Sequence, residues 1–139
     1  MSVEFLVDTS AWNRSNATPE VAARWTDLSL SGHVAICLPV RLELLVSARG
    51  QADYAAFADE LDGLPSCPLD HQVASRAEVV QRLLAERSQH RGPTAVDLLV
   101  AAIAETNNIK LLHYDHHFDA IARVTGQATE WIAPRGTVD

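Results

Sequence analysis

The chain has few cysteines and no long apolar run. Its two cysteines, Cys37 and Cys67, lie in apolar, strand-like surroundings and form no CxxC motif, so we expect reduced thiols rather than a disulfide. The longest uninterrupted apolar run, Leu98 to Ala104, is too short to span a bilayer. Glu4 and the lack of a basic lead are not typical of a signal peptide. We therefore expect a cytoplasmic protein without membrane contacts.

Basic residues are also scarce. The chain has 11 Lys and Arg against 18 Asp and Glu, which gives a formal net charge of −7 and a pI near 5.2. This balance excludes a uniformly basic nucleic-acid-binding surface, so a polyanionic partner would need local basic patches or bound cations. With 139 residues, 47% apolar and 21% charged, the composition otherwise predicts one compact domain over residues 1–139.

Short apolar runs alternate with segments of helical periodicity. We predict strands at 3–7, 33–38, near Cys67, 109–114 and 127–132, and helices at 19–30, 39–48, 52–61, 71–87, 94–106 and 118–124. In the helix at 39–48, Leu42, Leu45 and Val46 are expected to face inward. Because parallel strands need crossover connections, the alternation predicts an α/β fold with a small, mainly parallel central sheet covered on both faces.

Acidic residues follow two of the predicted strands. The first strand ends as FLVD on Asp8, and a later one ends as LLHYD on Asp115. Glu43, in LPVRLELL, lies on an apolar helix flank and is expected to be partly buried, and Asp97, in TAVDLLVAAIAE, shares a helix face with small apolar residues. Because ligands of open parallel sheets bind at the carboxyl ends of the strands, we expect these four acids to converge there.

Each acid also has a structural explanation. The two strand-end aspartates could be helix N-caps, which are worth about 0.5–2 kcal/mol each. Asp97 fits a capping box with Thr94. Glu43 could pair with Arg41, Ser47 or a distant arginine. Any one of these acids taken alone favours the structural interpretation, and only their convergence favours chemistry.

Converging carboxylates repel one another, which raises the pKa of one or more of them unless a cation is bound. Mg²⁺ and Mn²⁺ are hard ions that prefer oxygen ligands, so an acid cluster without thiolates predicts metal-assisted phosphoryl chemistry. His113, His116 and His117 crowd the Asp115 junction and leave a zinc site as an alternative. It is the less favoured one, because adjacent histidines cannot share a helix face and no HExxH motif is present.

The same segments resemble the PIN-domain family, and within it the VapC-like ribonuclease toxins of bacterial toxin–antitoxin pairs. They are FLVDTSAW, LPVRLELL, TAVDLLVAAIA and LLHYDHHFDAIA, in this order along nearly the whole chain. The resemblance implies a Mg²⁺-dependent endoribonuclease, in which Mn²⁺ can substitute, with Asp8, Glu43, Asp97 and Asp115 as catalytic acids. Asp8, Asp97 and Asp115 would bind the metal. It also implies a PIN-like α/β/α sandwich with a mixed sheet.

Supporting residues are implied as well. Ser10, or less favourably Thr9, matches a hydroxyl that supports the metal site in this family. Where the family often has a second acid, two residues after Asp115, this chain has His117, and Asp119 is the candidate for a water-mediated substitute. The sequence therefore leaves open whether one or two metals bind. The mechanism implied by the resemblance predicts products with a 5′-phosphate and a 3′-hydroxyl.

The resemblance also implies partners: an RNA of the tRNA or rRNA class, a cognate VapB-like antitoxin whose tail blocks the acidic site, and a second copy in a homodimer. Trp12 and Trp25 lie on early segments expected to contact the antitoxin. The candidate RNA-facing cations are Arg14, Arg41, Arg49, Arg87 and Arg91.

Two other classes of protein remain as alternatives. A phosphoryl-transfer enzyme of the haloacid-dehalogenase type also begins with an apolar strand and an aspartate, but it needs a second acid where this chain has Ser10. A catalytically silent PIN-like module that binds RNA or a partner stays open because His117 replaces an acid.

Overall fold

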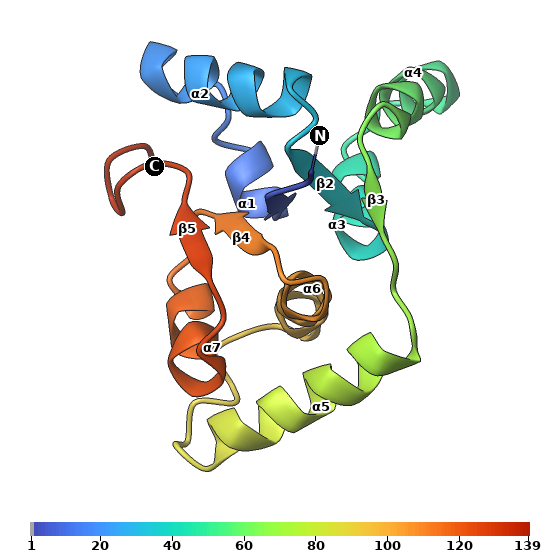
Figure 1. The fold of residues 1–139 in the computed structure, drawn as a ribbon. Coiled ribbons are helices and arrows are strands. Elements are labelled where there is room, and N and C mark those ends of the chain that lie inside the picture. The colour runs from blue at the N-terminus through green and yellow to red at the C-terminus, as the bar shows by residue number, and fades with distance from the viewer. Residues whose placement is uncertain (1) are drawn as a thin grey trace.

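The structure is a computed structural model that describes residues 2–139 and has an α/β architecture with a five-stranded sheet (Figure 1). The strand order is β3-β2-β1-β4-β5, and all four pairings are parallel. The mainly parallel sheet is therefore confirmed, and the mixed sheet is wrong for the described residues. The strands are β1 (Phe5–Val7), β2 (Val34–Cys37), β3 (Ser66–Cys67), β4 (Lys110–His113) and β5 (Thr129–Trp131).

Helices connect the strands and cover both faces of the sheet. They are α1 (Thr9–Trp12), α2 (Pro19–Leu30), α3 (Leu38–Leu45), α4 (Gln51–Asp62), α5 (His71–Ala85), α6 (Ala95–Thr106) and α7 (His117–Thr125). The start of α1 was predicted only through the N-cap interpretation of Asp8, because a helix of four residues is too short to show a period of its own. Both cysteines are free, as expected. None of the helices within residues 2–139 combines the length and the apolar character needed to cross a membrane.

The apolar core has two parts, one on each face of the sheet. Leu6 of β1 and Leu111 of β4 pack with buried residues of α3, α5, α6 and α7. Their neighbours Phe5, Val7 and Leu112 point to the opposite face and pack with α1, α2 and the segment after β5. Figure 1 shows α5 and α6 on one side of the sheet and α2 on the other. Strand β1 lies at the centre of the sheet, between β2 and β4, and is therefore buried on both faces. Its carboxyl end lies in the middle of the row of strand ends.

Helix α3 differs from the prediction in the face that it buries. Leu45 is 4% exposed, but Leu42 is 54% and Val46 84% exposed. Val40 and Leu44 supply the rest of the inward face instead. Because α3 carries apolar residues on two adjoining faces, its period alone could not identify the inward one. Glu43 is exposed as well, so its predicted partial burial is wrong.

We expect Leu45→Ala to destabilise the protein by about 2–5 kcal/mol, because it leaves a cavity in the core. Leu42→Ala removes the same atoms from an exposed position and should cost less than about 1 kcal/mol. Urea unfolding of the two variants at low protein concentration tests this pair. Equal losses would contradict the assigned orientation of α3.

Candidate active site

Asp8 lies at the carboxyl end of β1 and is only 5% exposed. Its Oδ2 accepts hydrogen bonds from the backbone N–H of Ser10 at 2.9 Å and from Ser10 Oγ at 2.6 Å. Ser10 Oγ in turn accepts the backbone N–H of Tyr114 at 2.9 Å. Asp8 is therefore the N-cap of α1, as the structural interpretation expected, and Ser10 also connects it to the end of β4.

The pKa of Asp8 is raised from 3.8 to about 6. Burial is the main cause, because it disfavours the charged carboxylate. The two hydrogen bonds from Ser10 oppose this effect, whereas the negative charges of Asp97 and Glu43 add to it. Three of the four predicted acids therefore interact electrostatically at this edge of the sheet.

Glu43 reaches the site from α3. Thr9 Oγ1 donates a hydrogen bond to Glu43 Oε1 at 2.7 Å, which joins the start of α1 to α3. Arg41 does not pair with Glu43, because its Nη1 binds Asp62 Oδ1 at 2.7 Å. Thr9 thus orients Glu43 and Ser10 orients Asp8, so the two hydroxyls have separate functions.

Asp97 has a structural role at the start of α6. Its Oδ2 accepts the backbone N–H of Thr94 at 2.9 Å, and its own N–H donates to Thr94 Oγ1 at 3.1 Å. This pair is the predicted capping box, which is confirmed. The same carboxylate also belongs to a cluster, because ligand atoms of Asp97, Asp115 and His117 lie within 4.8 Å of one another. The capping and ligand interpretations of Asp97 are therefore compatible.

Asp115 is held by the turn between β4 and α7. Its Oδ1 accepts the backbone N–H of His117 at 2.9 Å, and its own N–H donates to His113 Nδ1 at 3.1 Å. His113 is fully buried, and burial lowers its pKa from 6.5 to about 4, so the ring is neutral at pH 7 and carries its hydrogen on Nε2. A structural role is what a histidine inside a predicted strand suggests, but its position gives no signal for this particular contact with Asp115.

His117 takes part in the cluster where the family pattern often has an acid. A β carbon at Gly92 would lie 3.4 Å from Cδ2 and 3.5 Å from Nε2 of His117, so the loop before α6 passes beside this ring. Asp119 instead accepts a hydrogen bond from Trp131 Nε1 at 3.2 Å. Its water-mediated role at the site stays a prediction.

The donor set fits a divalent ion. Asp97 and Asp115 offer hard carboxylate oxygens, and the buried carboxylate of Asp8 adds negative charge nearby. The imidazole of His117 is a softer ligand, which favours a transition ion such as Mn²⁺ over Mg²⁺. The structure thus brings Asp97, Asp115 and His117 into ligand range of one another, and the charges of Asp97 and Glu43 both act on Asp8.

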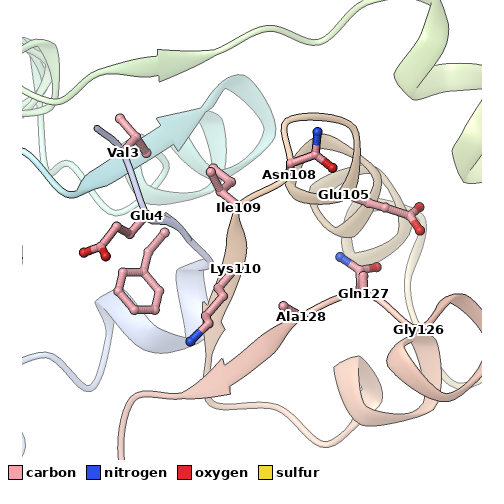
Figure 2. Close-up of a pocket in the computed structure, with 10 residues that line it drawn as sticks. Val3, Glu4, Glu105, Asn108, Ile109, Lys110, Gly126, Gln127 and Ala128 are labelled. Atoms are coloured by element: carbon pink, nitrogen blue, oxygen red, sulfur yellow. The ribbon is translucent and has the colours of Figure 1, made fainter. Parts of the chain in front are cut away.

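A separate hollow of about 570 Å³ lies at the opposite edge of the sheet, where β1, β4 and β5 begin (Figure 2). Two of its polar side chains are already paired. Glu105 binds Arg76 at 2.6 Å, and the side-chain amide of Gln127 donates to the carbonyl oxygen of Ala101 at 3.0 Å. Because ligands of open parallel sheets bind at the carboxyl ends of the strands, this hollow is not the candidate active site.

Comparison with known proteins agrees with this arrangement of acids on a parallel sheet. The PIN domain family model matches residues 5–124, which include all four acids. The chain belongs to the PIN-domain family. Ribonuclease VapC18 of Mycobacterium tuberculosis is 48% identical over 136 residues, covering 96% of this chain and 98% of the relative. Ribonuclease VapC51 of the same organism is 39% identical over 139 residues, with both chains fully covered.

Solved structures support the fold of this PIN chain. DNA-bound VapBC from Salmonella typhimurium superimposes with a TM-score of 0.74 at 16% identity, covering 94% of this chain and 99% of the other. VapBC-5 from Mycobacterium tuberculosis gives a TM-score of 0.61 at 19% identity, covering 94% and 96%. The curated relatives confirm the resemblance to VapC-like PIN domains, and the solved structures confirm the α/β fold.

Asp8→Asn should stabilise the metal-free protein at pH 8 by about 1–3 kcal/mol, because it removes a buried charge but keeps an oxygen for Ser10. A raised folded-state pKa means that the contribution of Asp8 to the stability of the wild type becomes less favourable as the pH rises from about 4 through 6. The advantage of the variant should therefore vanish near pH 4. The titration of His113 affects both proteins alike and cancels in the difference. Urea unfolding in EDTA across this pH range measures the difference in the free energy of unfolding between the variant and the wild type. A difference that does not change with pH would contradict the raised pKa of Asp8.

Proposed function

We propose that the chain is a metal-dependent endoribonuclease of the toxin type, folded as one domain over residues 1–139, which hydrolyses RNA phosphodiester bonds. The observation that carries the proposal is the convergence of Asp97, Asp115 and His117 within 4.8 Å at the sheet edge that holds the buried Asp8. Named ribonucleases at 48% and 39% identity along nearly the whole chain support the same activity.

Each site residue has its own role in this proposal. Asp8, Asp97 and Asp115, with His117, would hold Mg²⁺ or Mn²⁺. When bound, the ion supplies charge neutralisation at the phosphate and a lower pKa for the attacking water. Ser10 holds the Asp8 carboxylate toward the site by two hydrogen bonds. Glu43 is exposed and held at Oε1 by Thr9, which leaves Oε2 to accept a proton.

The partners of this function are part of the proposal. Single-stranded loops of tRNA or rRNA suit an exposed site, because their bases are unpaired and accessible. Leu38, Leu42 and Val46 form an exposed apolar row along α3 that supports a homodimer. Trp12 and Trp25, with ring centroids 5.3 Å apart, line a groove of about 250 Å³ that supports docking of a VapB-like antitoxin.

A catalytically silent binding module is the alternative function, favoured only by His117 standing where an acid is frequent. Such a module would bind RNA or the antitoxin without cutting RNA. The two functions differ in a single observable, cleavage in the presence of a divalent ion.

The purified protein should cleave RNA with Mn²⁺ or Mg²⁺ and leave 5′-phosphate and 3′-hydroxyl ends. Asp97→Asn and Asp115→Asn should each lower kcat by on the order of 10²–10³, because each removes a charge that holds the ion. Asp59→Asn, an exposed acid on α4, is the matched control and should keep full activity. Ends carrying a 2′,3′-cyclic phosphate would contradict the mechanism, and no cleavage with either ion would favour the silent module.

Saturating Mn²⁺ should raise the melting temperature of the wild type, since 100-fold excess over Kd is worth about 2.7 kcal/mol. Asp97→Asn should lose most of this gain while keeping its capping bonds. Thr94→Ala should do the opposite: it removes the cap, at about 1 kcal/mol, and keeps the Mn²⁺ response. Identical responses to Mn²⁺ in the wild type and Asp97→Asn would show that Asp97 has only the capping role.

A further inference from the structure

A second pocket of about 400 Å³ lies directly beside the acid cluster. Ser10 and Asp115 line it, and both also belong to the candidate active site. Its other walls include Arg14, which follows α1, and Arg135 in the segment after β5. A group bound in this pocket would therefore be a direct neighbour of a group bound at the acids.

Arg14 is fixed in position but its charge is not compensated. Its guanidinium lies 4.7 Å from the centre of the Tyr114 ring, and Nη1 donates to the carbonyl oxygen of Ser10 at 3.2 Å. Nε is buried and has no hydrogen-bond partner within residues 2–139, so the terminal nitrogens of the guanidinium are the donors that a ligand could reach, and no carboxylate in that range forms an ion pair with Arg14. An arginine held in this way keeps donors for a ligand without further loss of side-chain freedom.

Arg135 brings a second cation to the same pocket. Its guanidinium lies 5.9 Å from the centre of the Trp131 ring, and within the described part of the chain it has no ion pair. The segment that carries it is tied to the site, because the backbone N–H of Val138 donates to Tyr114 Oη at 3.1 Å. Two arginines without an ion pair within residues 2–139 thus line this pocket, whose walls also carry the carboxylates of Asp115 and Asp139.

We propose that this pocket binds the RNA phosphate next to the scissile one, with Arg14 and Arg135 as its ligands. The proposal rests on the proposed ribonuclease function. The planar guanidinium of arginine can donate two parallel hydrogen bonds to the oxygens of one phosphate. Such charge-assisted hydrogen bonds are stronger than those between neutral groups.

A base is a poorer occupant, because the aromatic rings of the pocket already have neighbours. Arg14 lies over the Tyr114 ring. The ring centroid of Trp131 lies 5.2 Å from that of Tyr114 in a T-shaped arrangement and 5.0 Å from that of His113 in a tilted one.

The test uses a single-stranded RNA oligonucleotide that the wild type cuts at one bond with Mn²⁺. The phosphates on either side of that bond are replaced, one at a time, by neutral methylphosphonates. At one of the two positions, neutralisation should lower kcat/KM of the wild type by about tenfold or more. Arg14→Gln and Arg135→Gln should start from a similarly lowered kcat/KM and lose little further from that replacement. Arg82→Gln, an exposed arginine on α5, is the control and should respond as the wild type does.

Binding of the same RNA in EDTA provides a second, independent measurement. Each pocket variant should flatten the dependence of log K on log salt by about 0.7, the value for one phosphate contact to a single strand. If the wild type cleaves but both pocket variants behave as Arg82→Gln does in both assays, the pocket proposal is wrong and the ribonuclease function stands. If the wild type binds RNA without cleaving it, the ribonuclease function fails, and unchanged salt slopes in the pocket variants would then overturn the phosphate site as well. Melting curves of each variant confirm folding, and Arg135→Gln, at an exposed position, serves if Arg14→Gln does not fold.

Discussion

The hydroxyl of Ser10 is the contact on which the site depends. It donates to the Asp8 carboxylate and accepts the backbone N–H of Tyr114, so one oxygen holds the ends of β1 and β4 in register. Parallel pairing brings the two strand ends together, and this bridge decides how the acids that follow them are oriented. Without it, Asp8 would be a buried charge with fewer donors, and the Tyr114 N–H would be left without its partner.

Charge imposes the second constraint. Placing Asp8 in the interior beside Asp97 and Glu43 works against the stability of the ion-free protein at neutral pH. The acidic surface that accompanies this site also repels a polyanion at long range. The two arginines of the proposed phosphate pocket would offset this repulsion close to the site, because they lie immediately next to the acids. The net charge of the chain is therefore a poor guide to the field that a substrate meets.

Much of this arrangement follows from sequence. An apolar run that ends on aspartate, repeated at FLVD and LLHYD, predicts two acids at one edge once the strands are taken as parallel. The Asp97 capping box was also readable from its spacing with Thr94. The environment of Glu43 was not, because α3 is apolar on two faces and only tertiary packing selects one. The burial of His113 and the pocket that Arg135 shares with Ser10 and Arg14 depend on distant segments, which local patterns do not report.

The bridge between Ser10 and Tyr114 joins residues 104 positions apart in the chain. Asp8 is synthesised about a hundred residues before β4, the strand that completes its surroundings. Until then β1 lacks its β4 partner and the acids stay apart, because a non-local contact cannot form before both halves are synthesised. Under the proposed function, the chain would therefore be inactive until the segment that contains β4 has been synthesised.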